Sequence, residues 1–165
     1  MRYDENTLNL KLLYNLIMKK KFFIIQILSV LAFINASYLS YKSYFVRFVD
    51  SAGLTSFCDV SKIFTCTDVL RHPLSQVFGI SFPWIAMFVY PVIFVLAFLG
   101  YKKLTNIYAK ILVVVSFLGV LFNGFILYRE IFFIHAYCLL CLLCTFIILS
   151  IFIISLDIVY KNKHK

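Results

Sequence analysis

The sequence predicts an all-α membrane protein, built as a bundle of four transmembrane helices. Hydrophobic residues make up 63% of the 165 residues, the mean hydropathy is +0.96 and only 14% of the residues are charged. A soluble globular domain carries more polar surface than this. Because each spanning helix takes roughly 20 mostly apolar residues, the chain has room for about four spans and one modest loop.

Four apolar segments account for most of the chain. The predicted spans are residues 22–44, 80–100, 111–128 and 135–160. The first is expected to be an uncleaved span, because no small-residue cleavage site of a signal peptide ends the apolar run. In the second, Pro83 falls in the first turns, where its missing amide donor costs little, and Pro91 predicts a kink. Arg129 and Glu130 mark the exit of the third span.

The segments between and around the spans are short. Residues 47–78 carry too many charges to cross hydrocarbon and predict a folded loop on the membrane surface. Residues 1–21 and 161–165 are expected to be cytoplasmic segments that flank the membrane domain, residues 22–160.

The net charge of +9 is explained by membrane topology. The basic residues cluster beside apolar runs, which does not favour nucleic-acid binding. With both termini and the turn between the second and third spans in the cytoplasm, eleven of the sixteen Lys and Arg lie inside: Arg2, Lys11, Lys19, Lys20, Lys21, Lys102, Lys103, Lys110, Lys161, Lys163 and Lys165. The loop and the start of the fourth span then share the non-cytoplasmic side of what we expect to be a bacterial inner membrane.

The five cysteines fall into two groups on that side. Cys58 and Cys66 lie in the loop, and Cys138, Cys141 and Cys144 begin the fourth span. Cysteines three residues apart share one helix face, and the open N-terminus of a helix favours a thiolate on the first of them. Together with the loop pair they could form a thiol relay. Cys144, deeper in the apolar segment, is read as a small hydrophobic residue.

Two other uses of the cysteines were weighed. A four-cysteine zinc site usually has two short knuckles, whereas Cys58 and Cys66 are eight residues apart, so no metal site is expected. A non-enzymatic membrane protein with incidental cysteines is the other alternative, and alkylation would then label all five as free thiols.

The motifs around these cysteines resemble those of the vitamin K epoxide reductase family in its bacterial form. The loop reads Cys58-Asp59-Val60, then Cys66-Thr67-Asp68-Val69-Leu70, then Phe78-Gly79-Ile80. The fourth span is approached through Tyr128, Arg129, Glu130, Ile134, His135 and Ala136, and opens with Cys138-Leu139-Leu140-Cys141. Of the two overlapping pairs in CLLCLLC, the family pattern selects Cys138 with Cys141.

The resemblance implies a four-helix bundle around a quinone, with the extracytoplasmic loop and its short helical piece capping the pocket. Cys58 and Cys66 would be the shuttle pair, with Cys66 exchanging with Cys138, and Cys141 would face a quinone of the ubiquinone or menaquinone type. Electrons would come from a separate thioredoxin-fold protein, because the chain ends at Lys165 without the fused domain of many relatives. Reduction of a quinone or vitamin K epoxide for its own sake would use the same residues.

Some positions depart from the family pattern. His72 stands where the family commonly has a serine, and is a candidate proton donor to the quinone or an ordinary loop histidine. The usual Gly-Ile-Pro reads Gly79-Ile80-Ser81. The predicted lining of the quinone pocket is Phe78, Trp84 and Thr145. Disulfide-generating membrane oxidases also have four helices and two cysteine pairs, but with the CxxC pair in the first outward loop; here the order is reversed.

Overall fold

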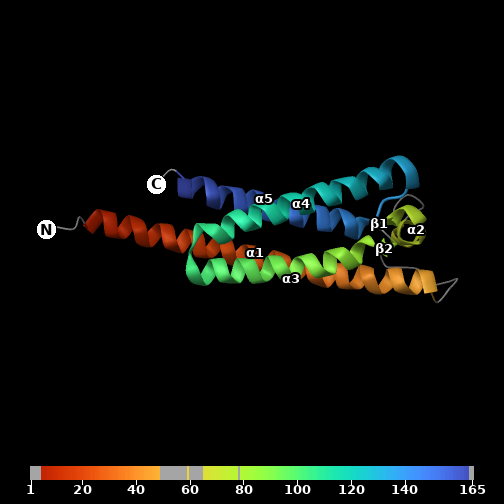
Figure 1. Ribbon diagram of the computed structural model, residues 1–165, viewed down its shortest axis with the longest axis horizontal. Coiled ribbons are helices and arrows are strands. Elements are labelled where there is room, and N and C mark those ends of the chain that lie inside the picture. The colour runs from red at the N-terminus through yellow and green to blue at the C-terminus, as the bar shows by residue number, and fades with distance from the viewer. Residues whose placement is uncertain (1–4, 49–58, 60–64, 78, 164–165) are drawn as a thin grey trace.

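Four long helices dominate the computed structural model, which describes residues 5–48, 59, 65–77 and 79–163. They are α1 (Glu5–Phe48), α3 (Phe82–Lys103), α4 (Asn106–Arg129) and α5 (Leu139–Lys163). Each is long and apolar enough to cross a membrane. The four run side by side along one axis (Figure 1), so the predicted four-helix membrane bundle is confirmed.

Short elements gather at one end of the bundle. Helix α2 (Cys66–Arg71) is followed by a 3₁₀ turn (Pro73–Ser75) and by a small antiparallel hairpin of β1 (Gln76–Val77) and β2 (Ile80–Ser81), which pairs Gln76 with Ser81. Gly79 has a φ of +79°, which a residue without Cβ adopts at little cost. These elements lie beside the end of α4 and the start of α5 (Figure 1).

The opposite end holds both chain termini and the turn between α3 and α4 (Figure 1). Leu104 closes that turn with a left-handed φ of 49°, and its N–H bonds to the Gly100 carbonyl at 2.9 Å. Lys21 of α1 forms an ion pair with Asp157 of α5. The Lys102 ammonium lies 4.7 Å from the ring centre of Phe98, as expected where a long basic side chain reaches from apolar surface towards water.

The helix ends differ in places from the predicted spans. Helix α1 begins at Glu5, so much of the predicted N-terminal segment continues the first helix. The fourth helix begins at Leu139 and not at 135, because α4 runs into a π-helical turn (Glu130–Ile134) that His135 ends with a left-handed φ of 54°. Pro83 falls in the first turn of α3 and Pro91 inside it, at the predicted places.

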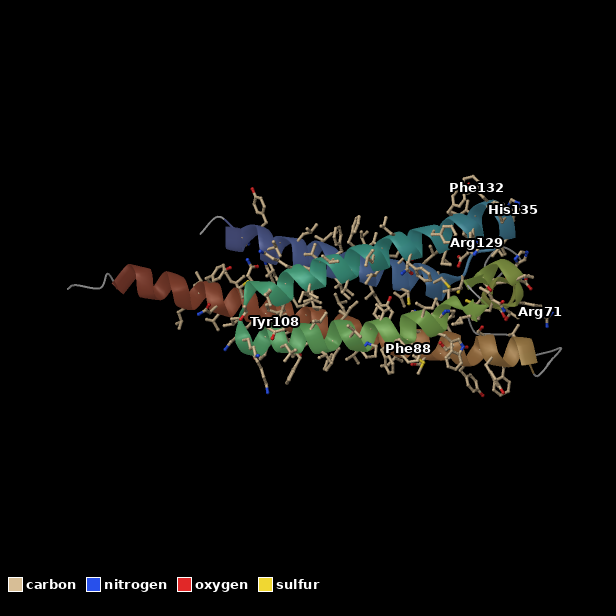
Figure 2. The ribbon with its side chains drawn as sticks, viewed as in Figure 1. Arg71, Phe88, Tyr108, Arg129, Phe132 and His135 are labelled. Atoms are coloured by element: carbon tan, nitrogen blue, oxygen red, sulfur yellow. The ribbon has the colours of Figure 1, made fainter. Side chains whose placement is uncertain are left out.

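The interior of the bundle is apolar and close-packed. Small residues let α1 and α3 approach: Ala32, Ala36, Ala97 and Gly100 are all buried. Large apolar side chains also cover the outside, with Phe88 72% exposed and Phe146 67% exposed, and Figure 2 shows Phe88 on the outer face of α3. In water such a surface would be costly, so it indicates contact with lipid.

Candidate active site

The loop cysteine Cys66 is the first residue of α2 and is fully buried. Asp59 fixes the start of this helix, because its carboxylate accepts hydrogen bonds from the Thr67 N–H at 3.1 Å and the Thr67 hydroxyl at 2.6 Å. These bonds satisfy a backbone donor at the helix N-terminus, as a capping side chain does. Val69 and Leu70 bury the inner face of α2 against the bundle. Cys66 is disulfide-bonded.

Cys138 lies just before α5 and is also fully buried. Its carbonyl accepts a hydrogen bond from the Leu142 N–H at 3.0 Å, which places Cys138 at the cap position of that helix. The left-handed residue His135 turns the chain back from the end of α4 to this point. Figure 2 shows His135, Arg129 and Arg71 at the same end of the molecule as α2.

The Sγ atoms of Cys138 and Cys66 lie 3.0 Å apart, although 72 residues separate them in the chain. Cys138 is a free thiol, whereas the Cys66 sulfur belongs to a disulfide. A covalent S–S bond measures about 2.05 Å, so the two sulfurs are unbonded and one short movement from exchange. The arrangement can pass a disulfide bond between the loop and the helix.

Two further free thiols continue from Cys138 into the bundle. Cys141 is buried one turn along α5 and interacts with the Cys138 side chain. Cys144 is buried a turn deeper, where the Asn35 side chain donates to its sulfur at 3.1 Å and to the Leu140 carbonyl at 2.9 Å. Cys144 therefore has a polar partner from α1 that the sequence did not reveal.

Glu130 is the residue of the site that sequence reasoning missed. It is 1% exposed, and Oε2 accepts a hydrogen bond from the Cys138 N–H at 3.4 Å. Oε1 has no hydrogen-bond partner among the described residues. The sequence offers one signal, a single carboxylate eight residues before the CxxC pair, and that position also marks the end of the third span.

The other predicted site residues are more scattered. Trp84, with Ser43 and Ser81, lines a cavity of about 230 Å³ between the end of α1 and the hairpin. Thr145 donates its hydroxyl to the Cys141 carbonyl at 3.0 Å, within α5. His72 ends α2, where its carbonyl accepts a hydrogen bond from the Ser75 hydroxyl at 2.8 Å. Cys58 and Phe78 lie outside the described residues.

A second cavity of about 220 Å³ lies between α3 and α4 and is mainly apolar, with Tyr90 and Asn123 as its polar residues. None of the four cysteines that the structure describes lines either cavity. In the part of the chain that the structure describes, no group of three or more His, Cys, Asp or Glu is arranged to hold a metal ion.

These features define an integral membrane helical bundle with a cluster of cysteines at one end. A model of the vitamin K epoxide reductase family matches residues 23–156, most of the chain, and the protein belongs to this family. Members of the family are oxidoreductases, and membership indicates a membrane redox function linked to quinones. No individual curated protein matches the chain significantly.

Proposed function

We propose that the protein is a thiol:quinone oxidoreductase, which oxidises a thioredoxin-fold partner and passes the electrons through two cysteine pairs to a membrane quinone. The observation that carries this proposal is the 3.0 Å approach of the free Cys138 sulfur to the disulfide-bonded Cys66 sulfur. Incidental cysteines on separate elements have no reason to meet at this distance in a buried site.

Cys58 is the proposed disulfide partner of Cys66. The two hydrogen bonds that Thr67 donates to the Asp59 carboxylate hold these residues together, and each of the two residues directly follows one of the loop cysteines in the sequence. The other three cysteines are free thiols. Both facts support a shuttle pair made of the two loop cysteines.

The electron transfer proceeds by two exchanges. The partner's dithiol first reduces the Cys58–Cys66 disulfide and leaves as a disulfide itself. The Cys66 thiolate then attacks Cys138 in a Cys138–Cys141 disulfide, and Cys141 leaves as a thiolate that takes up a proton released by the partner's thiols. Cys58 next attacks Cys66, which restores the loop disulfide and releases Cys138.

A quinone of the ubiquinone or menaquinone type is the proposed final acceptor; it takes up two electrons and two protons. Cys141 lies inside the apolar helix α5, whereas Cys138 precedes it, so Cys141 is the member of the pair that we propose to face the lipid-soluble quinone. The largely apolar lining of the cavity beside Tyr90 suits such a molecule. Thr145, Trp84 and Phe78 remain predicted contacts, and His72 remains a predicted proton donor.

The direct test is anaerobic reduction of a short-chain quinone by the purified protein, with a reduced thioredoxin-fold protein as the electron donor. We expect one hydroquinone for each partner disulfide formed, and no reaction with the Cys138→Ala variant. Oxidation of the partner without quinone reduction would refute the proposal. Equal rates for the native protein and the Cys138→Ala variant would refute it as well.

A further inference from the structure

A buried carboxyl group lies beside the thiols, and the exchange reactions do not use it. Glu130 is 1% exposed, and it is bonded to Cys138, which belongs to a buried apolar cluster with Leu39 and Ile126. One of its oxygens holds the Cys138 N–H, and the other has no hydrogen-bond partner among the described residues. Cys138 and Cys141 belong to one buried cluster, so the carboxyl group is held beside the thiol pair.

This arrangement is costly for a residue with only a structural task. A buried carboxylate loses its hydration and normally requires a cation or several hydrogen bonds. The neighbouring Arg129 is engaged elsewhere: it donates to the Gln76 carbonyl at 3.3 Å, and its guanidinium lies 5.2 Å from the ring centre of Phe125. A neutral Asn or Gln would cap Cys138 equally well, so the helix cap alone does not explain a carboxyl group.

We propose that Glu130 is the proton acceptor of the Cys138–Cys141 pair, an inference that rests on the proposed function. When the reduced pair gives up its electrons, the Cys141 S–H bond breaks, its electron pair stays on sulfur and the proton forms an O–H bond on the Glu130 carboxylate. Glu130 then releases this proton to an oxygen of the quinone that is being reduced. As the S–S bond forms, the Cys138 S–H bond breaks and its proton goes to the other quinone oxygen. The pair ends as a disulfide and the quinone as a hydroquinone, so two electrons and two protons pass from the pair to the quinone.

The position of Glu130 suits this task in two respects. Its carboxyl is anchored through Oε2 on the backbone of one member of the pair, which leaves Oε1 as a free acceptor for a proton. Burial excludes bulk water, so a proton leaving the thiol needs an acceptor inside the protein.

The test compares Glu130→Gln with the native protein in two measurements. The first is the rate of quinone reduction. We expect this rate to fall about 100-fold, the usual effect of removing a general acid–base group. The second, without quinone, is the alkylation rate of each cysteine in the reduced protein, followed by mass spectrometry. We expect Cys141 to react faster in Glu130→Gln, because one less anion faces its thiolate, and Cys144 to be unchanged.

Cys144 is the internal control, because a loosened bundle would expose both thiols. Asp157→Asn, at the other end of the molecule, should match the native protein in both measurements, and Glu130→Asp should recover part of the lost activity. Native-like quinone reduction by Glu130→Gln, or a parallel rise in Cys141 and Cys144 alkylation, would overturn the inference. If the native protein reduces no quinone, the proposed function fails, and a change confined to Cys141 alkylation would still show that Glu130 acts on this thiol.

Discussion

Cys138 is the residue at which both proposed transfers meet. Its sulfur lies 3.0 Å from the Cys66 sulfur, and Cys141 follows one turn along the same helix. Because Cys138 caps α5, the free N–H groups of the first turn and the positive end of the helix dipole lie close to its side chain.

Replacing either member of the helix pair should abolish the activity. Cys138→Ala and Cys141→Ala each remove one sulfur of the disulfide that accepts electrons from the loop, so thiol-dependent quinone reduction should fall to background while the protein still inserts. Cys144→Ala should keep most of the activity, because Asn35 retains its bond to the Leu140 carbonyl. An inactive Cys144→Ala with an active Cys138→Ala would mean that the other overlapping pair is used.

The cysteines could be found from the sequence because their spacing carries information by itself. A pair three residues apart lies on one helix face in any helix, and the charge bias placed the loop on the same side of the membrane. Glu130 and Asn35 could not be found in this way. Their roles depend on how α4 and α1 pack against α5, which no local pattern of residues specifies.

At the scale of elements, the anchoring of α2 decides whether Cys66 meets Cys138. Asp59→Ala removes two hydrogen bonds from the start of α2, at a cost of about 1 kcal/mol for a lost cap. We expect the exchange between Cys66 and Cys138 to slow about fivefold, measured by quenching the reaction with acid and separating the products.

The matched variant for this measurement is Asp68→Ala. Asp68 lies on the exposed side of the same helix, where its carboxylate bonds the Thr65 hydroxyl. The exchange rate should change little, because this bond does not involve the Thr67 N–H. An equal slowing in both variants would contradict the anchoring role of Asp59.

The contact between α1 and α3 requires a glycine at position 100. A Cβ at Gly100 would lie 2.7 Å from Cζ of Phe22, whose ring is fully buried. Gly100→Ala should therefore destabilise the bundle by about 1–3 kcal/mol and lower its thermal unfolding midpoint in detergent by several degrees. Gly124→Ala is the control, because a Cβ there meets nothing within 4 Å and Ala is the better helix former; its midpoint should stay or rise.

Composition was sufficient to predict the four helices, because a spanning segment must be apolar along its length. The short elements at the end of the bundle that holds the cysteines were harder to predict from the sequence. The π turn and the left-handed His135 shift the start of α5 to Leu139, and they depend on how the chain must return to meet α2. The hairpin at 76–81 has two residues in each strand, which is too few to show the alternation of apolar and polar residues that predicts a strand.

At the scale of the whole molecule, the two ends differ in charge and chemistry. Both termini and the α3–α4 turn share the end opposite to the cysteines (Figure 1), and most of the lysines belong to those segments. From the positive-inside bias we predict cytoplasmic termini and an extracytoplasmic cysteine end, in the proposed bacterial inner membrane. In a bacterium, this orientation would expose the cysteines to the oxidising compartment in which disulfide bonds form.

This orientation can be tested with cysteines introduced into variants whose native cysteines are replaced by Ser. Phe132 is exposed at the end of the bundle that holds the cysteines. A Phe132→Cys variant should therefore react in intact cells with a maleimide that does not cross membranes. Lys103→Cys, exposed at the other end, should react only after the membrane is permeabilised. The reverse pattern would show that the topology is inverted.

The central claim is that a disulfide moves between the loop and the helix through Cys66 and Cys138. Cys141→Ser removes the sulfur that leaves when the Cys138 bond is attacked, so a bond between Cys66 and Cys138 should accumulate under mild oxidation. The Sγ atoms need only close from 3.0 Å to bonding distance. Non-reducing proteolysis with mass spectrometry should recover the cross-linked pair, with Cys58 as the free loop thiol. Recovery of Cys58 joined to Cys138, or of no cross-link, would contradict the account.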